Sequence, residues 1–564
     1  CLLHAMELVP ALGEVGFKSH VNGPTIWTGD SLARCGRTRL PGYYDFNSLT
    51  YGVAQSLALS EYLAHIMMEG EQPYDMATEF DPLRYAGGWA GVDYTVEKVH
   101  ETYSHNNSVS YPFENRTGGR QHIEHSPSLR ALFSAFAARG ALFGFSNAGI
   151  EVPLAYPQSP ISHDAQKTFS SFPWAEAAQD EAATLLTGVG IGYASFSKIR
   201  VASGSSDAAT QLLERATTNI LPKAVGACRL TYAPTRAGKV LAEFTITRDG
   251  KYGADKAAEA TNTCDHDFYL VGPRDYAQHD LAWLEQLRDD LAVEAAAGRV
   301  RFDASALELA DITSQVEILH IAGPQSHSMM RELSPAAADI GFLRSRKLNL
   351  LGISARVFCI SFSGELGYEL HVPADDAATL YDIIWSHSAA AAHNLRPFGS
   401  HAVNSLRIEK GFKVKADLDY AHWTEAGIEP FVKLKRKATH TFLGRDAQPP
   451  VYPSARRAAM FEIDVPIEFS WSVPGDSPIR DAAGEIVAFT TTSAFGAVTR
   501  RTIAHGYVNL DEAGNMRAAP GETGLYIECY GHQWAVNVLA KPPVALGQAA
   551  STDPHQQIPA QAVG

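Results

Sequence analysis

Two segments of the sequence place a carboxylate beside a second polar side chain on one face of an expected strand. Alternation of apolar and polar residues puts Glu243 on the same face as Thr245, and Glu369 on the same face as His371. Carboxylates and histidines are side chains that general acid–base chemistry uses. The same alternation is also typical of a strand face that is exposed to water. The pattern alone specifies no reaction and favours the exposed interpretation.

Other short motifs are better explained without a ligand. The run GVGIG at 188–192 is superficially like a dinucleotide fingerprint, which needs a strand before it and a helix after it. A helix-like run precedes it and a strand-like run follows, so we interpret it as a helix-to-strand turn. His122 and His125 lie in a glycine-rich segment and predict an exposed pair, and we expect no metal site. Ser146 in GFSNAG has its second glycine one position too late for a nucleophile elbow.

The composition excludes several classes of protein. The chain has 564 residues, of which 45% are hydrophobic and 19% charged, and this ordinary globular mixture excludes a wholly disordered chain. Its net charge of −15 argues against nucleic-acid binding, and no apolar stretch is long enough to predict a membrane span. Six scattered cysteines without a C-x-x-C pair indicate buried free thiols in a reducing compartment. The length suggests about three or four domains.

Periodicity and turn residues predict the elements that would position these side chains. Helices are expected over 53–68, near 128–138 and over 279–291, the last with a stripe of Leu281, Leu284, Leu287 and Leu291. Strands are expected over 240–247 and twice within 356–372, around the turn at Ser363-Gly364. Prolines predict a linker at 153–163, and short strands between 443 and 545 predict a small β-barrel or sandwich.

Several longer runs resemble known families. GELGYEL at 364–370 and SLRIEKGF at 405–412 look like the signature of the glycine-cleavage T-protein family, the aminomethyltransferase fold. The same family is resembled by GPQSHSMMREL at 323–333, FLGRDA at 442–447, TTTSAFG at 490–496 and HGYV at 505–508. Upstream, the sequence is similar to the dimethylglycine and sarcosine dehydrogenase family, in NGPTIWTGD at 22–30, FDPLRY at 80–85, NNSVSYPFENRTGGR at 106–120 and HDLAWLE at 279–285.

This resemblance implies an α+β multidomain fold. Residues 1–85 would be the C-terminal part of an FAD-dependent oxidoreductase domain of the D-amino-acid oxidase type, and 86–160 its central module and linker. Residues 161–442 would form the T-protein-like folate-binding domain and 443–547 a small C-terminal β-barrel, followed by a flexible tail at 548–564. The glycine fingerprint for the flavin nucleotide would lie before Cys1, so we expect a processed or incomplete N-terminus and weak flavin binding by this chain.

The resemblance also implies a two-site flavoprotein. FAD would take hydride from the N-methyl carbon of a small methylated amine, and the one-carbon unit would reach tetrahydrofolate or leave as formaldehyde. The flavin loop would be Ser48, Leu49, Thr50, Tyr51, Gly52 and Val53, with Ser48 and Thr50 in place of glycines. The folate contacts would be Glu243, Phe244, Thr245, Phe362, Glu369, Leu370 and His371, with Glu369 expected on the pterin. Phe362 and Pro430 stand where the family has tyrosines, and Lys415-Ala416 where it has Trp-Gly. Catalytic residues stay unassigned.

Partners and alternatives follow from the same resemblance. The electron acceptor would be an electron-transfer flavoprotein or oxygen, and the location would be the mitochondrial matrix in a eukaryote or otherwise the cytoplasm. Two alternatives stay open. One is a flavin-independent, folate-dependent aminomethyltransferase. The other is a non-catalytic regulatory subunit of the pyruvate dehydrogenase phosphatase type.

Overall fold

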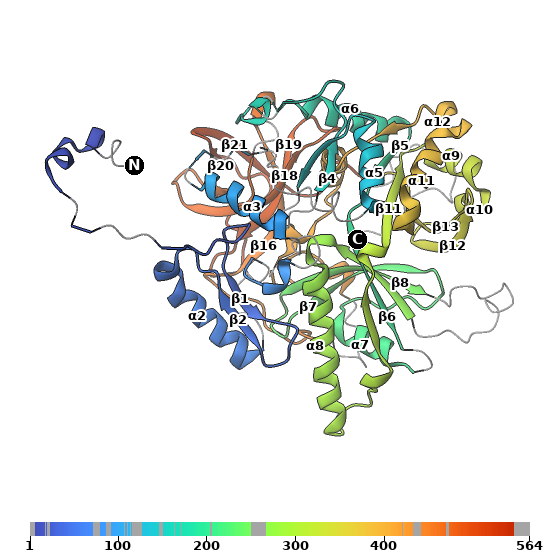
Figure 1. Cartoon of the computed structure of the whole chain (residues 1–564), viewed down its shortest axis with the longest axis horizontal. Coiled ribbons are helices and arrows are strands. Elements are labelled where there is room, and N and C mark those ends of the chain that lie inside the picture. The colour runs from blue at the N-terminus through green and yellow to red at the C-terminus, as the bar shows by residue number, and fades with distance from the viewer. Residues whose placement is uncertain are drawn as a thin grey trace.

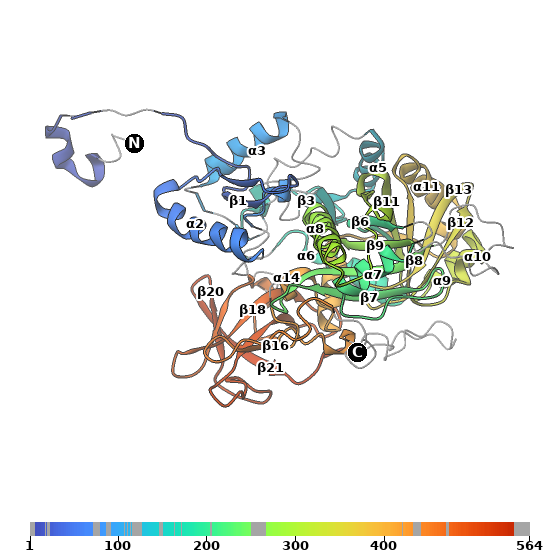
Figure 2. The same cartoon turned by 90° about the horizontal axis from the view of Figure 1, so that it is seen from below.

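The computed structural model describes the chain apart from residues 1–5, 17, 20–22, 71–78, 86–91, 107, 110, 113, 115–126, 146–150, 163, 171, 204–205, 250–266, 420, 433–441, 470–472 and 546–564. Two largely antiparallel sheets with helices on their outer faces form the larger part of the molecule, and a closed β-barrel lies beside them (Figures 1 and 2). A small N-terminal unit lies next to the first of these sheets and the barrel. The predicted α+β multidomain fold is confirmed.

The first sheet has five strands in the order β10-β6-β9-β8-β7. Its members are β6 (Phe196–Ala202), β7 (Cys228–Pro234), β8 (Val240–Asp249), β9 (Asp267–Pro273) and β10 (Glu308–Asp311). Helices α7 (Ala208–Ala216) and α8 (Ala277–Ala296) cover its outer face. The strand predicted over 240–247 and the leucine stripe predicted over 279–291 are confirmed, because Phe244 and Ile246 meet the four leucines of α8 in one buried cluster.

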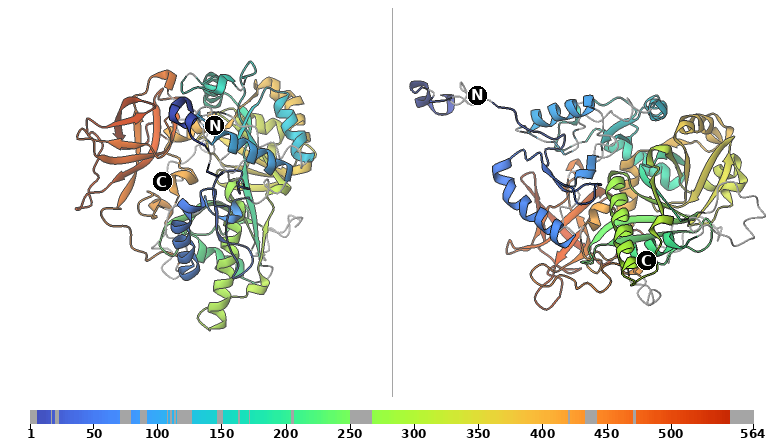
Figure 3. Two further views of the ribbon diagram at one scale, coloured as in Figure 1. Left: turned by 60° about the vertical axis from the view of Figure 1, so that its left-hand side comes forward. Right: turned by 60° about the horizontal axis from the view of Figure 1, so that its bottom comes forward.

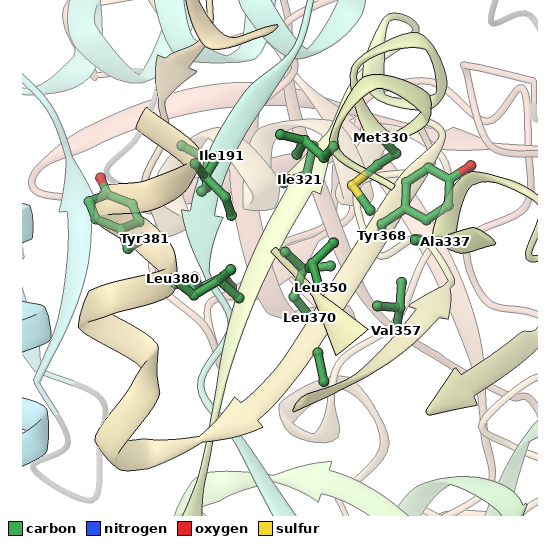
Figure 4. Close-up of a cluster of buried hydrophobic side chains, with 14 of the residues drawn as sticks. Ile191, Ile321, Met330, Ala337, Leu350, Val357, Tyr368, Leu370, Leu380 and Tyr381 are labelled. Carbon is green, nitrogen blue, oxygen red and sulfur yellow. The ribbon is translucent and has the colours of Figure 1, made fainter. Parts of the chain in front are cut away.

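The second sheet has six strands in the order β12-β13-β14-β11-β5-β15. They are β5 (Gly190–Tyr193), β11 (Val316–Ala322), β12 (Arg344–Leu350), β13 (Ile353–Cys359), β14 (Gly367–Pro373) and the short β15 (Arg396–Pro397), which is parallel to β5. Its outer face is covered by α5 (Pro127–Ala137), α9 (Ser326–Leu333), α10 (Pro335–Ala338), α11 (Ala374–Ser386) and α12 (Ser388–Ala392). Figure 4 shows Tyr368 and Leu370 of β14 within this core. The strand pair predicted within 356–372 is confirmed.

The inner faces of the two sheets meet in a region that we call the inter-sheet layer. The pairing register places Phe196, Lys198, Glu243, Thr245 and Tyr269 on the inner face of the first sheet. The inner face of the second sheet carries Ile318, His320, Arg356, Phe358, Glu369 and His371. Contacts between Tyr269, Val271 and Phe358 join the two faces. Side chains that alternate with outer-face core residues are therefore covered by the opposite sheet.

The C-terminal strands close into the barrel β16-β19-β18-β17-β20-β21, which confirms the predicted small barrel. The strands are β16 (Arg456–Ile463), β17 (Pro478–Arg480), β18 (Ile486–Phe495), β19 (Thr502–Asn509), β20 (Tyr526–Cys529) and β21 (His532–Leu539). Helix α13 (Ser400–Glu409) packs against β18 and β19 of the barrel, and α14 (Lys415–Leu418) lies between β8 of the first sheet and β18 of the barrel. Helix α6 (Ala175–Thr187) packs against α13. The carboxylate of Glu409 accepts hydrogen bonds from the backbone N–H groups of Val498 and Thr499, and so ties α13 to the barrel.

The N-terminal unit contains the hairpin β1 (Arg34–Arg37) and β2 (Tyr44–Asn47), and the long helix α2 (Gly52–Glu69), seen at the side of the molecule in Figure 3. Gly70 ends α2 in a left-handed conformation, as the helix predicted over 53–68 requires. The unit meets α8 where Asp81 Oδ2 lies 3.8 Å from His279 Nε2, and His279 Nδ1 lies 3.0 Å from Asp280 Oδ1 within α8. Burial disfavours the charged imidazole, but these two carboxylates outweigh it and raise the pKa of His279.

The predicted linker at 153–163 is wrong at its start. Residues Glu151–Ala155 form β4, which pairs with β3 (Leu142–Phe145) through a register shift. Pro153 is accommodated because a two-stranded edge with a bulge does not need every backbone N–H. Helix α5 packs against α11 although it lies before residue 161, and the predicted domain boundaries stay a prediction. Further helices are α3 (Val92–His105) and the 3-10 turns Pro10–Glu14, Pro82–Tyr85, Asp164–Gln166, Arg274–Tyr276, Ala304–Ala306, Thr313–Gln315, Glu429–Phe431 and Ile467–Phe469.

The described cysteines agree with the prediction of buried free thiols. Cys35, Cys228, Cys359 and Cys529 are all buried and unpaired. Within the part of the chain that the structure describes, no helix is both long and apolar enough to cross a membrane.

Candidate functional site

Glu243 and Thr245 lie on the inner face of β8 and are half-buried, because the inter-sheet layer covers them. The carboxylate oxygen Oε2 of Glu243 is shielded from solvent and has no hydrogen-bond partner. Burial raises the pKa of Glu243 to about 7, against the opposing effect of the Lys415 ammonium. The interpretation of this face as water-exposed is therefore wrong. A carboxylate with this pKa can hold or release a proton near neutral pH.

Glu369 and His371 lie on the inner face of β14 and are more deeply buried, at 6% and 3% exposure. His371 Nε2 lies 3.0 Å from Glu369 Oε2, and His371 Nδ1 lies 2.9 Å from the Tyr269 hydroxyl of β9. Burial raises the pKa of Glu369 to about 7 and lowers the pKa of His371 well below its usual value. The exposed interpretation is thus wrong for this pair too, and the pair is bound to the opposite sheet through Tyr269.

A buried lysine of the first sheet, Lys198, acts electrostatically on Glu369. Lys198 of β6 is fully buried, and its ammonium donates to the Val316 carbonyl at 2.7 Å. Burial lowers the pKa of Lys198 to about 7, although the Glu317 carboxylate opposes this shift. Glu317 in turn accepts from Tyr193 at 2.6 Å and from Arg274 at 3.2 Å. These hydrogen bonds join β5, β6 and β11 to the 3-10 turn Arg274–Tyr276.

Helices α13 and α14 supply a second group of charged side chains, which acts on Glu243. Arg407 of the SLRIEKGF run is 2% exposed and donates to Asp417 Oδ2 at 3.0 Å, to the Phe412 carbonyl at 2.9 Å and to Thr492 of the barrel at 3.0 Å. Lys415 is also buried, and its ammonium lies 4.8 Å from the centre of the Tyr276 ring. Arg407 and Lys415 both act electrostatically on Glu243. The barrel thereby helps to hold the charges that surround this carboxylate.

Several polar atoms around the layer are left without partners, as expected of a site built for a polar ligand. They are Oε2 of Glu243, Nε2 of His320 and the hydroxyl of Ser361. Among the described residues, Oε1 of Glu369 also has no hydrogen-bond partner, whereas its Oε2 meets His371. Two carboxylates with available oxygens suit a ligand that carries several N–H donors, as the pterin edge of a folate does. The residues present therefore fit a folate.

The remaining predicted folate residues divide into two groups. The ring of Phe362 lies edge-on to Phe196 at 6.4 Å, next to the layer, and its loop carries Ser361. The side chains of Phe244 and Leu370 instead lie in the outer cores of the two sheets, away from the layer. Sequence reasoning missed Tyr269 and Lys198, whose positions follow only from strand pairing. Arg407 was recognised only as part of a family motif.

The predicted flavin loop, Ser48 to Val53, lies apart from these residues, between β2 and α2. Ser48 adopts φ +58, and the buried hydroxyl of Thr50 has no partner. Tyr51 donates to Asn106 at 3.0 Å, Leu49 packs on the cluster beneath α2, and Val53 is fully exposed. Helix α2 begins at Gly52 without a side-chain cap, so the N–H groups of Gly52 and Val53 are available to an electron-rich ligand edge. These features fit the ring end of a flavin.

The glycine run at 188–192 is a helix-to-strand turn, as predicted, between α6 and β5. A Cβ added at Gly190 or Gly192 would lie 2.7 Å or 2.4 Å from the Phe398 ring. The glycines therefore serve close packing. His122, His125 and Ser146 lie outside the described residues, and among the described ones no cluster of three or more His, Cys, Asp or Glu side chains could hold a metal ion.

Comparisons with known proteins agree with this geometry. The family model of the GCVT N-terminal domain matches residues 132–436, and that of the FAD dependent oxidoreductase central domain matches residues 69–122. In solved structures, the chain is similar to the glycine cleavage system aminomethyltransferase T from Bartonella henselae, with a TM-score of 0.55, 19% identity, and coverage of 74% of this chain and 98% of that one. At this identity the likeness shows the fold.

Curated relatives are similar over nearly the whole chain. Mitochondrial dimethylglycine dehydrogenase of Mus musculus is 28% identical over 96% of this chain and 57% of its own length. Mitochondrial sarcosine dehydrogenase of Mus musculus is 25% identical over 96% of this chain and 59% of its own. The mitochondrial pyruvate dehydrogenase phosphatase regulatory subunit of Mus musculus is 25% identical over 89% and 55%. The chain spans little more than half the length of these relatives.

Proposed function

Because the chain belongs to the family of the GCVT N-terminal domain, we propose that its inter-sheet layer binds tetrahydrofolate and receives a one-carbon unit there. The one-carbon unit comes from the oxidative N-demethylation of a small methylated amine by a flavin-dependent half. The named relatives are dehydrogenases of such amines, dimethylglycine and sarcosine. The observation that carries the proposal is a pair of carboxylates, the half-buried Glu243 and the buried Glu369, that face one layer with oxygens free for a ligand.

The residues of the layer divide the work between binding and proton handling. Glu369 accepts hydrogen bonds from the N–H edge of the pterin while Phe362 contributes apolar contact beside it. Glu243, with its pKa raised to about 7, holds or takes up a proton at Oε2 as the one-carbon unit is transferred. When bound, tetrahydrofolate supplies the nitrogen nucleophiles that accept this unit. Exclusion of water from the layer keeps the one-carbon unit from being lost as formaldehyde.

The flavin side of the proposal rests on the segment between β2 and α2. The backbone of Ser48 to Gly52 and the uncapped start of α2 would hold the ring end of FAD, which supplies hydride-accepting chemistry. We propose an electron-transfer flavoprotein or oxygen as the electron acceptor. The location would be the mitochondrial matrix in a eukaryote, or otherwise the cytoplasm.

A binding experiment tests the folate site directly. Isothermal titration with 5-formyltetrahydrofolate, a stable folate, should show binding by the wild-type chain. Glu369→Gln should weaken binding at least tenfold, because it replaces an ionised acceptor with a neutral amide and a charge-assisted hydrogen bond contributes about 1.5–3 kcal/mol. The matched control is Glu332→Gln on α9, whose half-exposed carboxylate pairs with His393 outside the layer and should bind normally.

The outcomes separate the candidate functions. Wild-type binding that Glu369→Gln leaves unchanged would refute the proposed site. Folate binding together with aminomethyltransferase activity in the absence of any flavin would favour a flavin-independent aminomethyltransferase for this chain. Absence of both would favour the regulatory role named in one relative.

A further inference from the structure

The hydrogen bonds of His371 carry information about its protons. Neutral imidazole has one N–H and one acceptor nitrogen, and a hydroxyl donor on one nitrogen forces the N–H onto the other. Tyr269 lies 2.9 Å from Nδ1, and Glu369 lies 3.0 Å from Nε2, so each ring nitrogen has one partner. His371 is 3% exposed and its pKa is lowered by burial, so the ring is neutral. Only two arrangements of protons are then possible along this chain of three groups.

In the first arrangement, Tyr269 donates to Nδ1, and the N–H at Nε2 donates to the Glu369 carboxylate. In the second, Glu369 is protonated and donates to Nε2, and the N–H at Nδ1 donates to the phenol oxygen. Among the described residues, Tyr269 has no other hydrogen-bond acceptor, so the second arrangement buries a phenol hydrogen without a partner. Leaving a buried donor unsatisfied costs free energy. The structure therefore favours the first arrangement, in which Glu369 is ionised.

We propose that Tyr269 is a positioning residue that acts through His371, fixing the imidazole tautomer that keeps Glu369 ionised and aimed at the ligand. The inference rests on the proposed folate function and adds a residue from the opposite sheet to it. One carboxylate oxygen of Glu369 is engaged by His371, and the other is left for the folate ring. We call the hydrogen-bonded chain Tyr269–His371–Glu369 the relay. Because Tyr269 belongs to β9 and Glu369 to β14, the relay also couples ligand recognition to the contact between the two sheets.

The surroundings of the relay contain charges of both signs. Lys198 on β6 and Arg356 on β13 both disfavour a proton on His371, and Lys198 favours the ionised form of Glu369. The Arg356 guanidinium lies 4.4 Å from the centre of the Tyr269 ring and is paired with Asp249 of β8. His320 on β11 pairs with Glu369 across the sheet, and burial lowers its pKa to about 4, so it is neutral. Glu317 on β11 is satisfied by Arg274 and Tyr193.

Removal of the phenol hydroxyl should leave the fold intact and release the tautomer. In Tyr269→Phe, the ring can place its N–H on either nitrogen, and protonation of Glu369 no longer leaves a buried phenol hydrogen without a partner. An unsatisfied buried donor costs about 1–3 kcal/mol, and lifting that cost from the protonated form corresponds to a rise of about one unit in the pKa of Glu369. The expected effect follows from the fraction of Glu369 that is ionised, with a pKa of about 7 in the wild type and about 8 in the variant. Folate binding by Tyr269→Phe should be nearly equal to that of the wild type at pH 9 and about ninefold weaker at pH 6.

The experiment measures the dissociation constant of 5-formyltetrahydrofolate from pH 6 to pH 9 for wild type and Tyr269→Phe. Their ratio cancels the titration of Glu243 and of the ligand itself. The matched control is Tyr368→Phe, which removes a buried tyrosine hydroxyl that contacts the His327 ring at 3.0 Å from the outer face of the same strand as Glu369. If Tyr269 had a purely structural role, Tyr269→Phe would weaken binding by the same factor at every pH. For Tyr368→Phe we expect either unchanged binding or a weakening that does not vary with pH.

A second variant keeps the inference testable if packing changes intervene. His371→Gln supplies an amide N–H to Glu369 that does not depend on a tautomer, so adding Tyr269→Phe in that background should leave the pH profile unchanged. A pH-independent ratio for Tyr269→Phe, or the same pH-dependent loss in the His371→Gln background, would overturn the positioning role while the folate site stands. If the wild-type chain does not bind 5-formyltetrahydrofolate, or Glu369→Gln binds it normally, the proposed function itself fails and the positioning role with it.

Discussion

Gly192 offers the sharpest test of the packing that supports the candidate site. In the structure, a Cβ at this position would lie 2.4, 2.7 and 2.8 Å from three atoms of the Phe398 ring. Phe398 is only 2% exposed and is enclosed by α6 and α13, so the ring cannot move aside. It also lies edge-on to His320 of the inter-sheet layer, at 5.6 Å between ring centres. Gly192→Ala should therefore disturb both stability and the layer.

The size of the effect follows from the crowding. Forcing one extra methyl group into a packed core costs about 1–3 kcal/mol. For a domain of about 150–250 residues, this corresponds to a fall of about 2–12 °C in the midpoint temperature of unfolding. Thermal unfolding followed by circular dichroism measures this fall. Gly341→Ala is the matched control, because a Cβ there meets open space, and it should change stability by less than about 0.5 kcal/mol.

A double variant assigns the cost to the ring. Phe398→Leu alone opens space and destabilises the core. The combination with Gly192→Ala should cost less than the two single changes together, with a coupling of about 0.5–3 kcal/mol. Additive costs, or a Gly192→Ala protein as stable as the wild type, would refute the packing explanation of the glycine run and reopen a ligand-binding one.

Three further substitutions or conditions test other parts of the fold. Gly444→Ala should destabilise by at least about 2 kcal/mol more than Gly514→Ala; both have positive φ, but only the first would place a Cβ 2.1 Å from a backbone oxygen. Equal thermal shifts would contradict this. The flanking carboxylates raise the pKa of His279 despite burial, so the charged imidazole stabilises docking of the N-terminal unit fully below about pH 6.5, and this stabilisation is lost as the pH rises through the pKa of His279 in the folded protein. Hydrogen exchange in α8, corrected for the intrinsic pH dependence of exchange, should therefore become faster over this rise in pH. Corrected exchange rates that do not change with pH would refute this role of His279. Arg407→Met should lower stability by about 3–5 kcal/mol in urea unfolding, because it leaves the buried Asp417 carboxylate without its cation; an unchanged midpoint would show that the remaining donors suffice.

Much of the local structure was predictable from the sequence because single-element patterns determine it. The alternation in 240–247 and the leucine stripe of α8 identify which faces enter a core, and both are confirmed. The state of the opposite face was not predictable, since it depends on a second sheet from distant sequence. Glu369 therefore looked exposed and is buried. The same cause hid Tyr269, which meets His371 across a separation of 102 residues.

The candidate site was predictable only through resemblance. Periodicity placed Glu243 and Glu369 on strand faces, while family motifs marked them as folate contacts, a role that stays a proposal. The side chains of Phe244 and Leu370 lie in the outer cores, as the alternation along their strands requires. The two residues are therefore removed from the proposed set of side-chain contacts to folate. The linker predicted at 153–163 failed at Pro153 because a proline can occupy an edge strand beside a bulge.

The division of the layer between two sheets has a consequence for the life of the protein in a cell. A ligand that touches both Glu243 and Glu369 ties together two bodies that must separate when the chain unfolds. Occupancy at a hundredfold excess over the dissociation constant would add about 2.7 kcal/mol to stability. Degradation through the unfolded state would then slow as the ligand accumulates. Protein abundance would then rise with ligand concentration without any change in gene expression.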